Sequence, residues 1–181
     1  KIFSKDVMAQ AKIRTAQARS FEKAADAMAY LERHDVPVVI KADGLAQGKG
    51  VIIATTHEQA KQAIRDCMET EVFGRAGKQV LIEQFLDGEE LTIMAFTDGK
   101  TIVPMPPAQD HKRVGNGDAG LNTGGMGAYC PAPLGTASLR DQVLHKVLQP
   151  MIDAMARIGS PFQGVLYAGL ILTKDGPKLI E

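Results

Sequence analysis

The sequence predicts an α+β protein with two lobes, a small α/β lobe followed by part of a larger lobe whose sheet is mainly antiparallel. Up to about residue 77, helix-like and strand-like apolar patterns alternate around a glycine-rich segment. Beyond residue 78, apolar runs of strand length follow one another and are separated by turn residues. The 181 residues, 45% of them hydrophobic, suffice for one ordinary domain or two small lobes. We therefore expect lobes at residues 1–77 and 78–181.

The overall composition excludes some classes of protein. Lysine and arginine total 21, as do aspartate and glutamate, so the net charge provides no general attraction to nucleic acid or to an anionic membrane. No apolar stretch approaches the roughly 18 residues of a membrane-spanning helix. Cys67 and Cys130 stand apart from any CxxC pair or histidine cluster, which predicts buried free thiols in a reducing cytosol. We expect a cytoplasmic protein in which any anion site is local.

Two helices are expected in the first 35 residues. Ser4 is a candidate N-cap for a helix that runs to about Ile13, and a short extended segment follows it. Residues 22–34 repeat apolar side chains at helical spacing, with Ser20 as the expected N-cap. This second pattern is amphipathic, which is typical of a helix that buries one face.

The glycine-rich segment "KADGLAQGKGV" lies between two strand-like runs, "VPVVIKA" and "VIIA". It does not have the spacing of a Walker loop, because Gly44 and Gly48 are separated by three residues and Lys49 is followed by Gly50. It also lacks the dinucleotide fingerprint, which would need a glycine in place of Ile53 and a helix directly after the loop. The segment is therefore predicted to be a loop between two strands.

A third helix, expected over residues 56–69, completes the small lobe. Thr55, just before it, and Glu58, in its first turn, have the spacing of a capping box. The larger lobe then begins with the strand-like runs "QVLIEQFL", "LTIMAFT" and "TIVPM". Short turns join these runs, the last at Asp98 and Gly99, so we expect an antiparallel meander.

Residues 104–133 are rich in glycine and proline and are predicted to be irregular. A loop of about thirty residues in a compact domain is commonly either functional or disordered, and the charged cluster "QDHKR" within it favours function over disorder. A helix is expected over residues 137–159, kinked or broken at Pro150. The chain closes with a predicted hairpin of "GVLYAGLILT" and "PKLIE" around the turn "KDG".

Four features in order along the chain suit a nucleoside triphosphate. Lysines at a strand end and in a flexible loop, Lys41 and Lys49, can meet phosphate groups as point charges. The strand before "DGEE" exposes main-chain groups that can pair with an adenine edge, and Glu90 can reach ribose hydroxyls. Glu181, at the end of the last strand, offers hard oxygens to magnesium. Each residue alone is typical of a solvated surface, and it is their order that indicates a nucleotide site.

These features resemble the ATP-grasp superfamily. More narrowly, "KADGLAQGKGV", "DGEEL", "PPAQDHKR" and "NTGGMGAYCPAP" are similar to the glycinamide ribonucleotide synthetase family of purine biosynthesis, over nearly the whole chain. The resemblance implies an ATP-grasp fold and an ATP-dependent, Mg²⁺- or Mn²⁺-requiring ligase. Such an enzyme joins glycine to 5-phosphoribosylamine through a glycyl phosphate, so the implied partners are small molecules, with no nucleic acid or membrane.

The resemblance also implies the roles of individual residues. The nucleotide-binding residues would be Lys41, Gly48, Lys49, Gly50, Glu83, Gln84, Phe85, Leu86 and Glu90, and the metal ligand would be Glu181. The substrate-binding residues would be Gln109, Asp110, Lys112, Arg113, Asn122, Thr123, Gly124, Gly125 and Met126. Of these, Lys112, Arg113 and Asp110 are the implied catalytic residues, with side chains that suit carboxylate, phosphate or ammonium groups. His111 is expected to serve in hydrogen bonding or packing.

Two departures from the superfamily pattern bear on the family assignment. Many ATP-grasp enzymes have an acidic metal ligand near Ala168 or Gly169, and its absence here supports the narrower family. The family's pattern also continues beyond Glu181, so we expect N- and C-terminal domains in a parent protein, monofunctional or fused to other purine enzymes, and no activity in residues 1–181 alone. The alternatives are another ATP-grasp ligase, such as a purine carboxylase, and a non-catalytic nucleotide-binding module.

Overall fold

The structure is a computed structural model that describes residues 1–44, 46, 50–117 and 119–181, with the backbone alone at residues 119, 121 and 122. Gly48 and Lys49 of the predicted loop lie outside the described residues. Contacts divide the chain into two compact units, the first of residues 1–5 and 16–86 and the second of residues 6–15 and 87–181. The lobe boundary predicted after residue 77 stays a prediction, although the contact-based boundary falls after Leu86.

The first unit is built on a four-stranded antiparallel sheet in the order β1-β4-β2-β3. Its strands are β1 (Ala18–Phe21), β2 (Val38–Ala42), β3 (Val51–Ala54) and β4 (Val80–Gln84). We expected β4 to open the sheet of the larger lobe, and this was wrong. β4 lies between β1 and β2, because Ile82 pairs with both Arg19 and Ile40.

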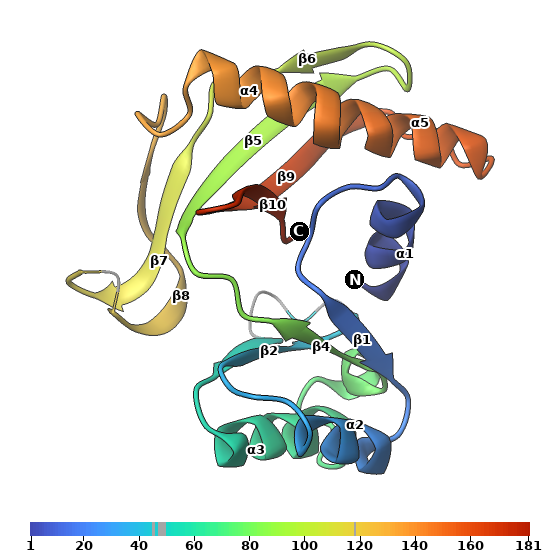
Figure 1. The fold of residues 1–181 in the computed structure, drawn as a ribbon, viewed down its shortest axis with the longest axis vertical. Helices are drawn as coiled ribbons and strands as arrows, with labels where there is room; N and C mark the ends of the chain where they lie inside the picture. Colours follow the sequence, from blue (N-terminus) through green and yellow to red (C-terminus); the bar gives the residue numbers. More distant parts are fainter. Residues whose placement is uncertain (45, 47–49, 118) are drawn as a thin grey trace. The chain divides into compact units, whose positions relative to one another are not determined.

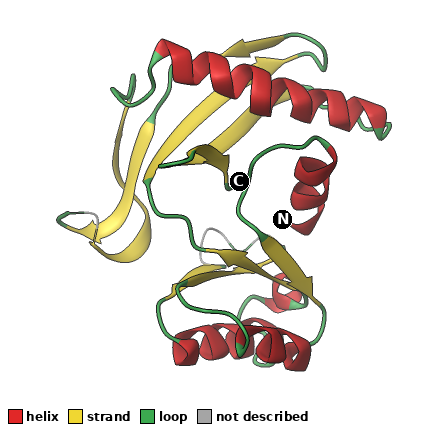
Figure 2. Cartoon of the chain, viewed as in Figure 1, coloured by secondary structure: helices red, strands yellow, loops and turns green. Residues whose placement is uncertain are grey.

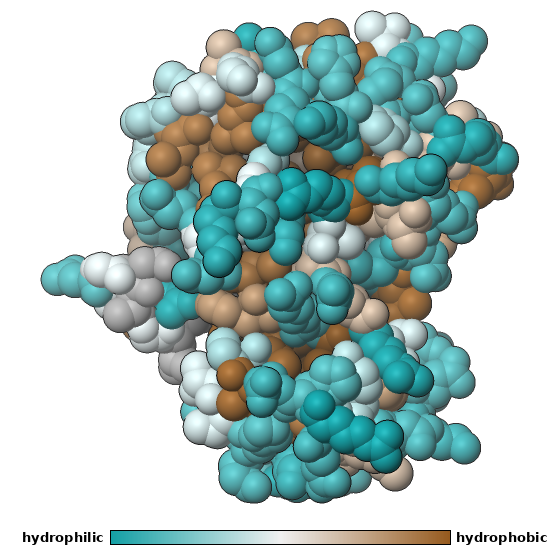
Figure 3. All heavy atoms as spheres, viewed as in Figure 1, coloured by the Kyte–Doolittle hydropathy of each residue, from teal (hydrophilic) through white to brown (hydrophobic). Residues whose placement is uncertain are grey.

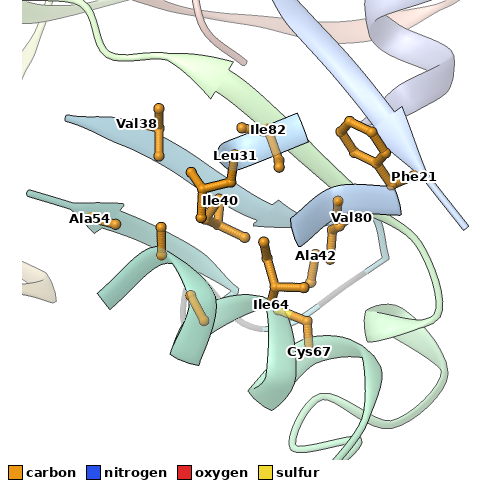
Figure 4. Packing of buried hydrophobic residues seen from close by; sticks show 13 residues of the cluster. Phe21, Leu31, Val38, Ile40, Ala42, Ala54, Ile64, Cys67, Val80 and Ile82 are labelled. Carbon is orange, nitrogen blue, oxygen red and sulfur yellow. The ribbon is translucent and has the colours of Figure 1, made fainter. Parts of the chain in front are cut away.

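Two helices, α2 (Ala24–Leu31) and α3 (His57–Met68), cover one face of this sheet (Figure 1). A short 3₁₀ helix (Gly74–Gly77) precedes β4. Figure 4 shows the core between the layers, where Ile40 of β2 meets Leu31 and Ile64 of the helices, and each of the three is fully buried. Each such side chain stabilises the unit by about 1.5–3 kcal/mol relative to leaving it exposed.

The helix starts differ from the predicted ones. α1 spans Ile2–Gln10, so Ser4 lies inside the helix and does not cap it. The residue before α2 is Lys23, whose side chain makes no capping bond, while the expected cap Ser20 belongs to β1. α3 is capped by Thr56, whose hydroxyl accepts a hydrogen bond from the Gln59 backbone NH at 3.2 Å. The Gln59 side-chain oxygen accepts from the Thr55 backbone NH at 2.9 Å, so the expected capping box of Thr55 and Glu58 was wrong and the N-cap lies one residue later, at Thr56.

The second unit contains a second antiparallel sheet in the order β10-β9-β5-β6. The strands are β5 (Glu89–Thr97), β6 (Ile102–Pro104), β9 (Gly164–Thr173) and β10 (Gly176–Leu179). The predicted hairpins β5–β6 and β9–β10 are confirmed. The strands "QVLIEQFL" and "LTIMAFT" do not form part of one meander, because β4 and β5 belong to different sheets.

One long helical segment lies over a face of this sheet (Figure 2). It consists of α4 (Ala137–Val143), a π-helical turn (Leu144–Leu148) and α5 (Gln149–Arg157). Pro150 was expected to kink or break the helix, and the structure instead has a π-helical turn that ends two residues before it, at Leu148. Proline has no NH to give to the carbonyl four residues back, so a local change of hydrogen-bond pattern there is expected.

The glycine-rich stretch that we predicted to be irregular is a two-stranded antiparallel hairpin. β7 (Gln109–Gly115) pairs with β8 (Ala119–Tyr129), with irregular register around Arg113. A bridge between Thr92 and Ala108 connects the start of this hairpin to β5. Glycines weaken strands in general, but here backbone pairing between two neighbouring segments outweighs that local preference.

Hydrophilic side chains cover most of the surface visible in Figure 3 in both units. Among the described residues, no helix is long and apolar enough to cross a membrane. Cys67 is a buried free thiol as predicted, whereas the prediction was wrong for Cys130, which is exposed. Burial, together with nearby Asp66, raises the pKa of the Cys67 thiol to about 11.

Candidate functional site

The first unit holds a buried cluster of three charged side chains, Lys5, Lys41 and Glu83. Lys41 on β2 and Glu83 on β4 point away from α2 and α3, because their neighbours Ile40 and Ile82 occupy the opposite, core-facing side of the sheet. The Lys41 ammonium lies 3.1 Å from one carboxylate oxygen of Glu83, and the Lys5 ammonium lies 3.3 Å from the other. The side chains are only 9%, 3% and 12% exposed for Lys41, Glu83 and Lys5.

The electrostatics of this cluster follow from its burial. Taking charges out of water is costly, so buried charges are almost always paired. Burial lowers the pKa of Lys5, and the Lys41 charge adds to this, while Glu83 acts in the opposite direction. One carboxylate thus faces two ammonium groups, which leaves the cluster with an excess of one positive charge when all three are ionised.

The predicted hinge begins where β4 ends. The Gln84 backbone NH donates to the Gln17 carbonyl at 2.8 Å, which continues the pairing with the β1 side. Within the part of the chain that the structure describes, the backbone groups of Phe85 and Leu86 have no hydrogen bond. Main-chain groups left open at the end of a strand can pair with the edge of a purine base, because unsatisfied NH and CO groups require partners.

The described ends of the glycine-rich loop are tied to β2. The Ala42 backbone NH donates to the Gly50 carbonyl at 2.8 Å, and the Gly44 NH donates to the Ala76 carbonyl at 3.2 Å. A Cβ atom on Gly50 would lie 2.7 Å from the Ala46 Cβ, so the close return of the chain requires glycine there. Lys41 therefore lies on β2, one residue before Ala42, whose backbone NH binds the Gly50 carbonyl at the end of the loop.

In the second unit, one face of the sheet carries a group of polar residues. Glu90 and Thr92 of β5 pair with Ile171 and Gly169 of β9, so they share the face opposite the buried Ile93. Tyr167 lies on the same face. Its hydroxyl is 3.4 Å from the Thr92 hydroxyl, and a Cβ on Gly169 would come within 3.0 Å of its ring.

Sequence reasoning missed Thr92 and Tyr167. The available signal was the alternation of β5 and β9, which assigns every second residue to the face that carries Glu90. The pairing of two strands far apart in the sequence was needed to bring these residues together.

The structure brings two predicted site residues into direct contact in this unit. The Lys112 ammonium lies 3.0 Å from a carboxylate oxygen of Glu90, with the two side chains 33% and 43% exposed. Partial burial alone would lower the pKa of Lys112, but the hydrogen bond and charge of Glu90 outweigh it, and Tyr167 and Asp110 add to this, so the pKa is raised. The expected ribose carboxylate and the expected substrate lysine therefore form one charged group.

Hydrogen bonds within the β7–β8 hairpin hold the substrate motifs together. The Thr123 hydroxyl donates to the Lys112 carbonyl at 2.8 Å and accepts from the Gly125 NH at 3.0 Å. Gly125 has φ +119°, and a Cβ there would lie 2.9 Å from an oxygen of Asp110. Glycine is therefore required at this turn of the strand.

The base of the hairpin is fixed by a second set of contacts. The Tyr129 hydroxyl donates to the side-chain oxygen of the buried Gln109, and the His111 ring lies 5.6 Å from the Tyr129 ring. Packing is thus the observed contact of His111. The remaining predicted substrate residues lie on the paired strands: Arg113 pairs with Asn122, while Gly124 and Met126 are exposed.

The candidate metal ligand, Glu181, follows β10. Its carbonyl accepts a hydrogen bond from the Gly169 NH at 3.0 Å, and its carboxylate is exposed. No group of three potential metal-ligating side chains occurs among the described residues. Magnesium often binds through one or two carboxylates together with substrate phosphates and water, so a single carboxylate at this position is compatible with that mode of binding.

The whole chain, residues 1–181, matches the family model described as phosphoribosylglycinamide synthetase, ATP-grasp (A) domain. It is 50% identical over 182 residues to a phosphoribosylamine–glycine ligase of Pseudomonas aeruginosa, covering 100% of this chain and 42% of that protein. It is also 50% identical over 182 residues to the human trifunctional purine biosynthetic protein adenosine-3, covering 100% of this chain and 18% of that protein.

The fold is similar to that of the crystal structure of a phosphoribosylamine–glycine ligase from Thermotoga maritima. The TM-score is 0.90 at 32% sequence identity, over 99% of this chain and 46% of that one. The chain thus spans less than half the length of each of these relatives.

Proposed function

The chain belongs to the phosphoribosylglycinamide synthetase ATP-grasp (A) domain family, and on this premise we propose that the protein uses ATP to join glycine to 5-phosphoribosylamine. The observation that carries the proposal is the 50% identity, over the whole chain, to phosphoribosylamine–glycine ligases. The products would be glycinamide ribonucleotide, ADP and phosphate.

The proposed reaction has two steps. The glycine carboxylate attacks the γ-phosphorus of ATP, which gives glycyl phosphate and ADP. The amine of 5-phosphoribosylamine then attacks the acyl carbon, loses a proton, and phosphate leaves. Both steps require alignment of reactants and stabilisation of negative charge, and neither requires a side-chain nucleophile.

In this proposal the residues of the first unit bind the nucleotide. Lys41 would contact phosphate, Gly50 and the predicted Gly48 and Lys49 would form the loop over it, and the main chain of residues 83–86 would bind adenine. The open backbone groups of Phe85 and Leu86 support the last assignment. The buried, net positive charge around Lys41 supports the first, because low exposure strengthens its attraction for phosphate.

The residues of the second unit would bind ribose, metal and substrates. Glu90 would accept hydrogen bonds from ribose hydroxyls, and Glu181 would hold Mg²⁺ or Mn²⁺, an ion that neutralises phosphate charge when bound. The catalytic residues Asp110, Lys112 and Arg113, with Gln109 and residues 122–126, would position glycine and the phosphoribosyl amine. The hydrogen bonds of Thr123 with Lys112 and with Gly125 support the proposal that the two motifs bind substrate together, because they join both arms of the hairpin.

The test is ADP release by the complete protein. We expect turnover only when glycine and 5-phosphoribosylamine are both present, and none when bicarbonate replaces glycine. Bicarbonate-dependent turnover would instead favour a purine carboxylase of the same fold, and nucleotide binding without any turnover would favour a non-catalytic module. Lys41→Ala should mainly weaken ATP binding, and an unchanged nucleotide affinity would remove Lys41 from the site.

Location and partners form the last part of the proposal. A purine-pathway ligase whose substrates are ATP, glycine and a phosphorylated sugar amine acts in the cytoplasm, where these metabolites occur. Its partners would be small molecules and the further domains of the same protein, and the human relative shows that such a segment occurs within a trifunctional purine biosynthetic protein.

A further inference from the structure

We propose that Lys5 is a positioning residue for the nucleotide, which acts by sharing the Glu83 carboxylate with Lys41 and so leaves positive charge at Lys41 for phosphate. This inference rests on the proposed function, because it assumes that Lys41 meets a phosphate group. Lys5 lies in the first helix, 36 positions before Lys41, and no sequence motif pointed to it.

The geometry places Lys5 against Glu83 and against the segment that leads into β1. Its ammonium lies 3.3 Å from Glu83 Oε1 and 3.2 Å from the Ala16 carbonyl oxygen. The Lys41 ammonium takes the other oxygen, Oε2, at 3.1 Å. Each carboxylate oxygen thus faces a different lysine, and the Ala16 contact fixes Lys5 to the segment that leads into β1.

The charge balance explains why a second lysine matters. A pair of Lys41 and Glu83 alone would be neutral, and a phosphate would have to compete with a buried carboxylate for its only cation. With Lys5 present, the same carboxylate is shared by two cations, so Glu83 neutralises less of the charge of Lys41. Because the three side chains are nearly buried, water screens these contacts weakly, so sharing the carboxylate with Lys5 substantially weakens the hold of Glu83 on Lys41.

Burial also indicates that the second charge is retained for function. The pKa of Lys5 is lowered, first by its burial and then by Lys41, which means that the fold holds this ammonium at a cost. Apolar side chains in place of the whole cluster would avoid the cost, since replacing all members of a buried ionic group by apolar residues is commonly neutral or stabilising.

The experiment compares nucleotide affinity and turnover in the complete protein. We expect Lys5→Met to weaken ATP and ADP binding about tenfold, with kcat at saturating ATP within about threefold of the unsubstituted value, because the proposed role of Lys5 is in binding, through Glu83. Lys5→Arg should restore the affinity to within about threefold, since it keeps the charge. Lys61→Met is the matched control, because Lys61 forms a partly exposed ion pair with Glu32 at 3.6 Å in the same unit, and it should leave nucleotide affinity unchanged.

A double-mutant cycle with Glu83→Gln tests the route of action. If Lys5 acts through the carboxylate, Lys5→Met should change nucleotide affinity less than about twofold in the Glu83→Gln background. The inference is overturned if folded Lys5→Met binds ATP normally, or if its effect is the same in both backgrounds. Should Lys5→Met alone not fold, Lys5→Gln takes its place in both backgrounds, and the same results support or overturn the inference.

The same measurements separate this inference from the proposed function. An unsubstituted protein that binds ATP but shows no turnover dependent on glycine and 5-phosphoribosylamine would refute the function and leave the role of Lys5 to the binding data. An unsubstituted protein that does not bind ATP would overturn both.

Discussion

The contact between Glu90 and Lys112 leads to a quantitative prediction about nucleotide binding. The two groups are 3.0 Å apart and 43% and 33% exposed, and a pair exposed to this extent contributes only about 0.2–1 kcal/mol. A carboxylate that accepts hydrogen bonds from ribose should contribute more, about 1.5–3 kcal/mol for a bond to a charged group. Loss of the ion pair and loss of the ribose contact should therefore change the affinity for ATP by different amounts.

The assay is ATP affinity in three variants of the complete protein. Glu90→Gln should raise the Kd for ATP by about 10- to 100-fold, because it removes the charged acceptor. Lys112→Met should change that Kd by no more than about threefold, because it removes only the exposed pair, while turnover at saturating ATP falls by about 100-fold or more. The double variant should bind ATP as Glu90→Gln does.

The two single variants control for each other, because both break the same ion pair. If they weakened ATP binding equally, the ion pair and not a ribose contact would explain the effect of Glu90. An unchanged Kd in folded Glu90→Gln would refute the reasoning altogether. Circular dichroism and the unfolding midpoint of each variant would establish that the second unit is folded.

Three further outcomes are expected. Gly125→Ala should lower the free energy of unfolding by about 1–3 kcal/mol and reduce turnover, because φ is +119° and the new Cβ would meet Asp110. Gly124→Ala, where a Cβ would have open space, should lower it by less than about 1 kcal/mol. Equal losses of stability would contradict the steric constraint at Gly125. The free energy of unfolding should fall between pH 9 and 11 by up to about 3 kcal/mol from Cys67, since its thiol ionises near 9.0 when unfolded and near 11 when folded, and Cys67→Ala should remove that part of the slope. A thiol reagent should modify the exposed Cys130 in the folded protein and Cys67 only on unfolding, so rapid reaction of both would show that Cys67 is accessible.

The first lobe shows how far local patterns lead. The runs that became β2, β3 and α3 were predicted from apolar periodicity, which depends only on neighbouring residues and on burial of one face. The sheet to which β4 belongs was not predicted correctly. The insertion of β4 between β1 and β2 depends on contacts between residues more than 35 positions apart, and no local pattern encodes them.

In the substrate segment, the sequence predicted the residues of the candidate site but not their secondary structure. Its residues 109–113 and 122–126 were identified from the sequence motifs, but the segment was expected to be irregular because its glycines have weak strand preference. Backbone hydrogen bonds between the two arms, and the Thr123 hydroxyl between Lys112 and Gly125, make it a hairpin.

By itself, the sequence determined the α+β class, the ATP-grasp family and the residues of the candidate site, because these depend on short motifs, their order and apolar periodicity. Only the tertiary structure decided which of those residues meet. The pairs Lys41–Glu83 and Glu90–Lys112, the third charge of Lys5, and the position of Tyr167 above Gly169 arise from strand pairing and burial. Burial also decides their energetics, since the strength of a charge contact depends on how far water is excluded from it.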